Sequence, residues 1–298
     1  MFKTVAELIE IAESRDLAIS EVMILKEIED TGTSREDIME QMGKNLDIME
    51  EGVEKGISAE GAHSHSGLTG GDAVLLQEYI AKGNTLSGGT LLDSVSKAMA
   101  TNEVNAAMGT ICATPTAGSA GVVPGTLLGL EPQLKPTREQ KIQYLLTSGA
   151  FGYVIANNSF ISGAAGGCQA EVGSATGMAA AAAVELAGGT AQQSGEAMAI
   201  ALKNMLGLVC DPVAGLVEVP CVKRNAIGAS TALVAADMAL SGIQSRIPCD
   251  EVIEAMYRVG QSMPTALKET AQGGLAATAT GKALEAKIFG GYKNQTNA

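Results

Sequence analysis

The stretch GSATGMAAAAAVELA, residues 173–187, is small or apolar at nearly every position and is interrupted only by Ser, Thr and Glu185. A helix that is apolar on every side normally lies inside a protein core. The longest uncharged stretches, such as residues 172–184, are also too short to cross a bilayer. We therefore expect residues 173–187 to form a buried helix.

The composition extends this expectation to the whole chain. Of its 298 residues 46% are hydrophobic, yet aromatic residues make up only 3%, Trp is absent and Gly reaches 36. Such a core must be built from Ala, Leu, Ile, Val and Met, whose small members allow helices to approach closely. Alternation of period two is scarce. The sequence predicts an all-α fold, a compact multi-helix domain with glycine-rich loops at its active site.

Helical spacing of apolar residues starts at the N-terminus. It predicts an N-terminal helical segment over 1–56, with Asp16 and Ser34 as N-caps, and a catalytic domain over 57–298. The two parts can also form one continuous domain. Further helices are expected over 72–81, 91–109, 190–206, 223–242, 250–259 and 261–271, before a polar tail that frays over 281–298.

The charge balance excludes several classes of partner. The formal net charge is −13 and no basic run of five or more residues occurs. Nucleic-acid binding requires clustered Lys and Arg, so we expect no nucleic-acid partner. The N-terminal stretch has charges throughout and lacks the apolar centre of a signal peptide. We expect a cytoplasmic protein without a membrane partner.

Five cysteines in a cytoplasmic chain are not a disulfide framework. Cys168 follows the turn SGAAGG and opens the Ala-rich helix, and a helix N-terminus favours the thiolate that metals bind. Cys210 and Cys221 stand at the two ends of a loop that contains Pro212 and Pro220. Their spacing alone leaves two interpretations open, metal ligands or buried structural thiols.

Two loops rich in Gly and hydroxyl groups, SGLTGG (66–71) and TPTAGS (114–119), are candidates for substrate binding. Their backbone N–H groups can bind a carboxylate, or they can be ordinary turns. The substrate-binding candidates are Ser66, Thr69, Gly70, Thr114, Thr116, Gly118 and Ser119.

The residue types leave the catalytic base unknown. Lys97, Asn102 and His65 are the candidates, since all three are near these loops in the sequence. Glu171 either tunes a metal site or pairs with Arg224. Cys112 and Cys249 are expected not to be ligands.

Three runs carry a resemblance to a known family: SGAAGGCQAEVGSA (162–175), NMLGLVCDPVAGLVEVPCVKRNAIG (204–228) and TALKETAQGGLAAT (265–278). They resemble the catalytic α part of the bacterial iron–sulfur L-serine dehydratases, over nearly the whole chain. The sequence is most similar to the α chain of the two-subunit form. The resemblance implies a lyase of amino-acid degradation and gluconeogenesis that converts L-serine to pyruvate and ammonia.

The resemblance also implies the cofactor and a partner. It assigns a [4Fe–4S] cluster to Cys168, Cys210 and Cys221, and leaves one iron open as a Lewis acid. Single-chain relatives have a C-terminal cysteine and a Ser-Ser-His-Thr motif, and this sequence contains neither. We therefore expect a separate β subunit to complete the site, and expect little activity from this chain alone.

Two other functions stay open at this point. A pyridoxal-phosphate-dependent dehydratase would need a Schiff-base lysine and a phosphate loop, for which residues 112–125 are a candidate. A non-catalytic helical scaffold subunit would need none of these groups, and its cysteines would only fill the core.

Overall fold

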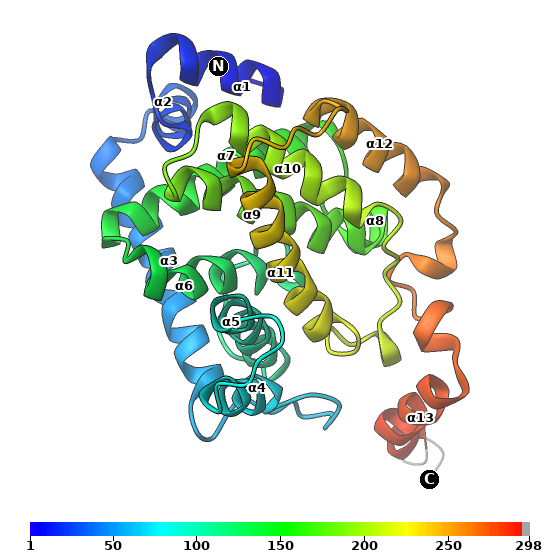
Figure 1. Cartoon of the computed structure of the whole chain (residues 1–298). Helices are drawn as coiled ribbons and strands as arrows, with labels where there is room; N and C mark the ends of the chain where they lie inside the picture. The colour runs from blue at the N-terminus through cyan, green and yellow to red at the C-terminus, as the bar shows by residue number, and fades with distance from the viewer. Residues whose placement is uncertain (294–298) are drawn as a thin grey trace.

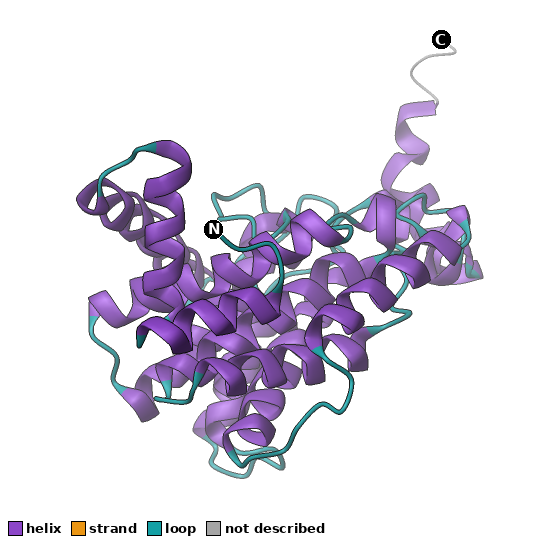
Figure 2. Cartoon of the chain, turned by 90° about the horizontal axis from the view of Figure 1, so that it is seen from above, coloured by secondary structure: helices purple, strands orange, loops and turns teal. Residues whose placement is uncertain are grey.

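The computed structural model describes residues 1–293, which form α-helices and short 3₁₀ or π turns but no strand (Figures 1 and 2). The all-α prediction is therefore confirmed. The helices are α1 (Val5–Arg15), α2 (Ile19–Thr31), α3 (Arg35–Ile57), α4 (Asp72–Ala81), α5 (Gly89–Ala106), α6 (Val122–Leu134), α7 (Arg138–Asn158), α8 (Gly163–Gly166), α9 (Ser174–Leu186), α10 (Ala191–Met205), α11 (Cys221–Leu240), α12 (Cys249–Ser262) and α13 (Ala279–Lys293).

Helix α9 is the buried helix that the Ala-rich stretch predicts. Every residue from Ser174 to Val184 is buried. The helix packs against α6, α7, α10 and α11, and it lies between the last three in Figure 1. Because its side chains are small, these neighbours reach its backbone from several sides, and the helix forms the centre of the core.

Helices α5 and α6 approach each other through glycine. A Cβ built on Gly125 would lie 2.5 Å from the backbone nitrogen of Ala98, and one on Gly129 would lie 1.9 Å from Ser94 Oγ. Neither distance is possible for a real side chain. This contact therefore depends on glycine for its closeness, as the composition predicts.

The N-terminal helices share this core. Phe2, Leu8, Ile19 and Leu46 are fully or almost fully buried in the same hydrophobic cluster as the alanines of α9. Acidic side chains from later helices also bind the first amides of these helices, Asp250 on α1 and Glu185 on α2. The division after residue 56 stays a prediction, and the structure places both parts around one core.

Of the two N-caps expected in this region, one is confirmed. Ser34 accepts a hydrogen bond from the backbone N–H of Asp37 at 3.1 Å and begins α3. Asp16 as an N-cap is wrong, because it ends α1 in the left-handed region with φ 52°. Helix α2 begins only at Ile19, where the carboxylate of Glu185 takes the capping role.

The helix expected over 261–271 is also wrong. Helix α12 ends at Ser262, and Pro264 two residues later cannot continue a helical hydrogen-bond ladder. Only a short 3₁₀ turn, Thr265–Leu267, follows. Glu269 and Ala271 then adopt positive φ angles of 61° and 54°, which no α-helix allows. The expected tail over 281–298 lies partly outside the described residues, and α13 occupies its first part.

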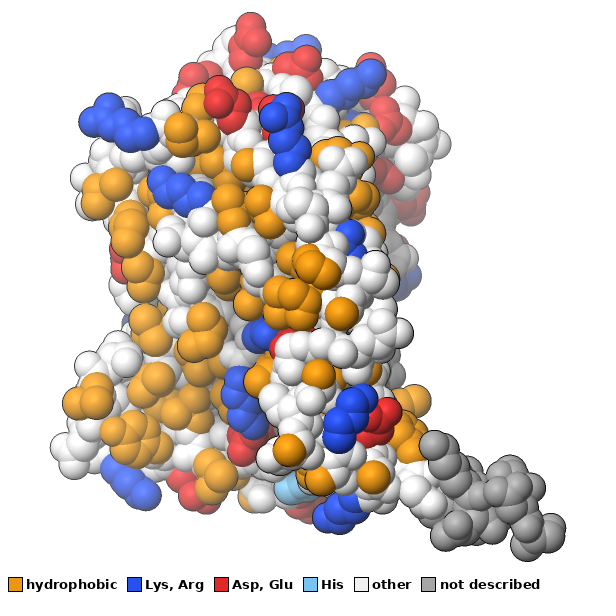
Figure 3. Space-filling model, turned by 90° about the vertical axis from the view of Figure 1, so that its right-hand side faces the viewer, with side chains coloured by type: hydrophobic (Ala, Val, Ile, Leu, Met, Phe, Trp, Pro, Cys, Tyr) orange, Lys and Arg blue, Asp and Glu red, His pale blue; other side chains and the backbone are white. Residues whose placement is uncertain are grey.

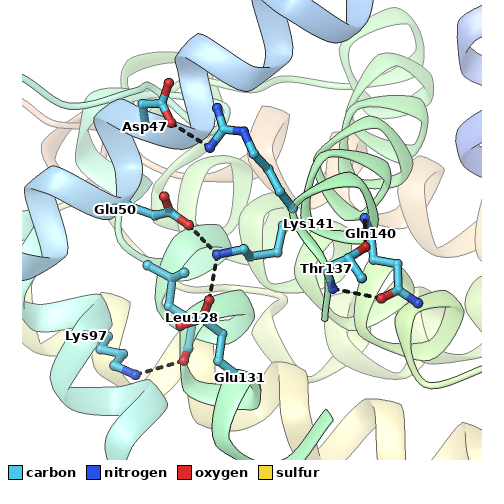
Figure 4. A network of polar contacts seen from close by, with 9 residues as sticks. Asp47, Glu50, Lys97, Leu128, Glu131, Thr137, Gln140 and Lys141 are labelled. Atoms are coloured by element: carbon cyan, nitrogen blue, oxygen red, sulfur yellow. Dashed lines mark hydrogen bonds and ion pairs between the residues drawn. The ribbon is translucent and has the colours of Figure 1, made fainter. Parts of the chain in front are cut away.

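A polar network joins α3 to α6 and α7 (Figure 4). Lys141 of α7 lies between Glu50 of α3 and Glu131 of α6, with 2.7 Å to Glu131, and Arg138 pairs with Asp47 at 2.7 Å. These pairs fix α3, which carries mostly polar residues on its outer side, against α6 and α7.

Within residues 1–293, none of the helices combines the length and the apolar character that a membrane span requires. On the face in Figure 3, basic side chains are scattered among acidic and hydrophobic ones and form no continuous basic band. This arrangement is consistent with the negative net charge.

Candidate metal and substrate site

Two of the three predicted cysteine ligands meet with a carboxylate in the interior. Cys168 lies between α8 and a π turn, Gln169–Gly173, that leads into α9, and Cys210 lies in the loop after α10. Sγ of Cys168, Sγ of Cys210 and a carboxylate oxygen of Glu171 are all within 4.8 Å of one another, and all three residues are buried. The backbone N–H of Gln169 donates to the carbonyl of Leu208 at 2.9 Å and so brings the two segments together.

Cys221, the third predicted ligand, is the first residue of α11 and is buried. It lies outside that tight group. Burial raises the pKa of its thiol, and the negative charge of Cys168 acts in the same direction. Arg224, one turn later on α11, donates to the carbonyl of Val209 next to Cys210, so the start of α11 lies against the Cys210 loop. Three segments that are separate in the sequence therefore present three buried sulfurs to one region.

The thiols of this region differ in their readiness to lose a proton. A hydrogen bond from the Cys210 thiol lowers the pKa of Cys168, and the nearby charge of Arg224 acts in the same direction. The same hydrogen bond, together with burial, raises the pKa of Cys210. Of the two thiols, Cys168 thus has the environment that favours loss of the proton, and a metal ligand must be a thiolate.

Arg224 holds the loop after α10 in place. It donates to the carbonyl of Val209 at 2.7 Å and forms an ion pair with Asp211 at 2.8 Å. The other oxygen of Asp211 accepts the N–H of Leu275 at 2.7 Å. The alternative of an ion pair between Arg224 and Glu171 is wrong, because Arg224 pairs with Asp211 instead.

Glu171 connects the cysteines to the second Gly-rich loop. Its Oε1 accepts a hydrogen bond from Thr116 Oγ1 at 2.7 Å, and its Oε2 lies 3.9 Å from Cys210 Sγ. Burial raises the pKa of this carboxyl group. Gly163 leaves room for the pair, since a Cβ there would lie 2.6 Å from Glu171 Oε2 and 2.8 Å from Cys210 Sγ.

The rest of that loop is held by its own turn and by two asparagines. Ser119 Oγ donates to the carbonyl of Thr114 at 2.9 Å. The carbonyl of Gly118 accepts from Asn225 at 2.8 Å and from Asn102 at 3.3 Å. The side chain of Asn102 therefore contacts the backbone of the loop.

The first Gly-rich loop joins the same region through a different carboxylate. Ser66 Oγ lies 2.7 and 2.9 Å from the two oxygens of Glu218, which is in the loop between Cys210 and Cys221. Thr69 is buried, and its hydroxyl has no hydrogen-bond partner among the described residues. Gly70 has φ 147° and packs directly on His63, so a side chain there would clash.

The remaining candidates lie elsewhere. The ammonium of Lys97 donates to the carbonyl of Leu128 at 2.8 Å (Figure 4). It also forms an ion pair with Asp93 at 2.7 Å. His65 is exposed on the first loop. Cys112 donates to the carbonyl of Asn45, and Cys249 is buried at the start of α12. Neither cysteine belongs to the group around Cys168.

Sequence reasoning assigned no role to Asp211 or Glu218. Both are inside the run CDPVAGLVEVPC, and they are its only charged residues. Charged residues in an otherwise apolar, proline-punctuated loop are a signal that they contact partners from other segments. The structure supplies those partners, Arg224 and Ser66.

The segment after α12 also reaches this site. The N–H of Cys210 donates to the carbonyl of Leu267 at 2.9 Å, and the N–H of Glu269 donates to the carbonyl of Cys210 at 2.7 Å. Cys210 and Lys268 thereby form an isolated parallel β-bridge. The last of the three sequence runs that carry the resemblance is thus in contact with the second.

Comparison with known proteins gives consistent matches. Residues 14–276 match the protein family described as serine dehydratase alpha chain. The chain is 71% identical over 291 residues to a probable L-serine dehydratase, alpha chain, of Bacillus subtilis, which covers 98% of this chain and 96% of the relative. It is 40% identical to the L-serine dehydratase, alpha chain, of Peptoniphilus asaccharolyticus, over 95% and 97% of the two chains. It is 36% identical to L-serine dehydratase 2 of Escherichia coli, over 92% of this chain but only 61% of the relative.

Proposed function

Because the chain belongs to the serine dehydratase alpha chain family, we propose that it converts L-serine to pyruvate and ammonia with a [4Fe–4S] cluster held by Cys168, Cys210 and Cys221. The observation that carries the proposal is the buried group of Cys168, Cys210 and Glu171, together with the start of α11, where Cys221 is buried and Arg224 binds the carbonyl of Val209 next to Cys210. The substrate follows from the names of the relatives. The cluster is what the family resemblance implies, and thiolate donors are chemically suited to it.

The donor set fits such a cluster. Thiolates are the usual ligands of iron–sulfur clusters, and three of them leave one iron without a cysteine. The Cys168 thiol has a lowered pKa, and the half-buried Arg224 beside it offsets negative charge. When bound, the cluster supplies a Lewis-acidic iron that makes the serine hydroxyl a better leaving group.

The protein residues then have positioning roles. Glu171 and Glu218 attach the two Gly-rich loops to the cysteine region through Thr116 and Ser66. In our proposal these loops, with Thr69, Gly70, Thr114, Gly118 and Ser119, enclose the serine molecule and exclude water from it. Asn102 and Asn225 fix the second loop by its backbone.

We place removal of the α-proton on a group of a separate β subunit. Lys97 is engaged by Asp93 and the Leu128 carbonyl, and His65 is exposed, whereas the three cysteines are buried. The relatives named alpha chain match this chain over nearly their full length, whereas the longer E. coli relative is matched over 61%. In the proposal, a partner chain takes the place of the remaining part of the longer relative.

The test is iron and sulfide analysis of anaerobically prepared protein. Replacing Cys168, Cys210 or Cys221 with Ser should reduce the bound iron from about four atoms per chain to a small fraction, and should abolish the broad absorbance of the cluster. Cys249→Ser is the matched control, because Cys249 is equally buried but belongs to another part of the core.

Two results would refute the proposal. Wild-type protein that binds no iron under anaerobic reconstitution would favour a metal-free scaffold. A sharp internal-aldimine band in place of the cluster absorbance would favour a pyridoxal-phosphate enzyme.

A further inference from the structure

The segment 263–277 lies directly against the Cys210 loop. In Figure 1 it descends from α12 toward α13, beside the loop that leaves α10. Two backbone hydrogen bonds join it to Cys210, one from Cys210 N–H to Leu267 and one from Glu269 N–H to Cys210. Lys268 is the residue between these two bonds and is therefore paired with Cys210.

This pairing places the backbone of Lys268 beside that of Cys210. Segments joined by such hydrogen bonds lie about 5 Å apart. The Cys210 side chain projects toward Cys168 and Glu171. Lysine carries its ammonium on a flexible four-carbon stem, so the charge of Lys268 is within reach of the candidate active site.

The charge of Lys268 is uncompensated in the structure. Among the Lys and Arg residues whose side chains the structure describes, each of the others is either exposed or has a carboxylate within 4.0 Å. Lys268 is half-buried and has no carboxylate within that distance. Partial burial of an unpaired cation is unfavourable, so such a residue indicates a place where an anion binds.

The other charged side chains at this site already have partners, so Lys268 is the cation available to bind an anion. Arg224, the other cation of the site, is already paired with Asp211. The acidic groups Glu171 and Glu218 are bound by hydroxyls of the two loops. Positive φ angles at Glu269 and Ala271 turn the chain immediately after Lys268, and such angles in residues other than Gly are typical of functional sites.

We infer that Lys268 binds the carboxylate of L-serine, an inference that rests on the proposed function. Its ammonium offers three N–H donors and a full positive charge, and charge-assisted hydrogen bonds to a carboxylate are the stronger kind. In this arrangement Cys210 helps to hold the metal, and Lys268, its partner across the β-bridge, orients the substrate.

The experiment compares Lys268→Met with the wild type. Met retains most of the apolar stem but loses the charge, and Lys203→Met, at an exposed lysine of α10, is the matched control. Cluster-loaded protein is titrated with L-serine, and with L-serine amide, which lacks the carboxylate charge, while the cluster spectrum is recorded. Lys268→Met should bind L-serine about 10- to 100-fold more weakly, but L-serine amide equally well. Lys268→Arg should retain part of the affinity.

Each other outcome overturns the inference. Unchanged L-serine affinity in Lys268→Met excludes the contact. An equal loss for L-serine and L-serine amide, or a failure of the variant to load iron, would show that Lys268 stabilises the cysteine loop instead. If wild-type protein neither binds L-serine nor, together with its partner chain, dehydrates it, the proposed function itself fails, which is a different result.

Discussion

At the scale of single residues, three carboxylates, one buried and two half-buried, have the same structural role: each binds the first amides of a helix. Glu103 accepts hydrogen bonds from the N–H groups of Asp72 and Ala73 at the start of α4. Glu185 and Asp250 do the same for α2 and α1. The first amides of a helix need acceptors and carry partial positive charge. A distant carboxylate that satisfies them also fixes where the helix docks.

Because Glu103 can take up a proton, its contact with the start of α4 should depend on pH, and this dependence can be measured. The residue is fully buried, and burial raises the pKa of its carboxyl group above the ordinary value of 4.5. The folded state therefore holds its proton to higher pH than the unfolded state does. The free energy of unfolding falls as the pH rises from about 4.5 through the raised pKa.

Glu103→Gln should remove this contribution. The difference in unfolding free energy between variant and wild type should shift in favour of the variant as the pH rises through that window, measured by urea unfolding at several pH values. Glu54→Gln, at an exposed position of α3, serves as the control. A constant difference across the window would contradict the assignment.

At the scale of elements, glycine determines how closely helices pack. Gly129 of α6 has no room for a side chain, because its Cβ would lie 1.9 Å from Ser94 Oγ of α5. Gly149 of α7 is also inside a helix, but nothing lies within 4 Å of where its Cβ would be. The two positions differ in packing and share the same secondary structure.

Replacing each with Ala should therefore have opposite effects. Gly129→Ala should destabilise the protein by about 1–3 kcal/mol, because α5 and α6 must separate. Gly149→Ala should stabilise it by about 0.4–1 kcal/mol, because Ala restricts the unfolded chain and favours the helix. Denaturant unfolding measures both values, and a stabilised Gly129→Ala variant would show that the α5–α6 contact is looser than described.

At the scale of the whole molecule, the site is assembled from four distant segments. The two Gly-rich loops, the Cys210–Cys221 loop and the segment after α12 meet around the start of α9. The chain covers 61% of the longer E. coli relative, and so matches only part of that protein. We therefore expect the assembled site to be completed by a second chain.

The partner can be tested by reconstitution. Cluster-loaded chain alone should turn over L-serine at less than about a hundredth of the rate of its mixture with a β subunit, since a general base contributes about 10²- to 10⁴-fold to the rate. Pyruvate formation measures the rate, and Cys249→Ser in the same mixture controls for handling of the cluster. An equal rate without the β subunit would place the base in this chain.

Several features of the protein follow from the sequence itself. The run of alanines over 173–187 predicts the buried helix, since a helix without a polar side has no face to offer to water. Ser34 predicts the start of α3, and the motif around the three cysteines indicates their region. The helix and its N-cap are local properties, because they depend on residues within one or two helical turns of each other, whereas the cysteine region follows from the family resemblance.

The tertiary structure alone decided the contacts between segments. Asp16 ends a helix where the sequence suggested a start, because Glu185, more than 160 residues later, caps the next helix. The partner of Arg224 is Asp211, and Lys268 lies opposite Cys210. Such pairings depend on how whole helices pack and on which polar groups are then left without a partner, and neither is encoded in the spacing of nearby residues.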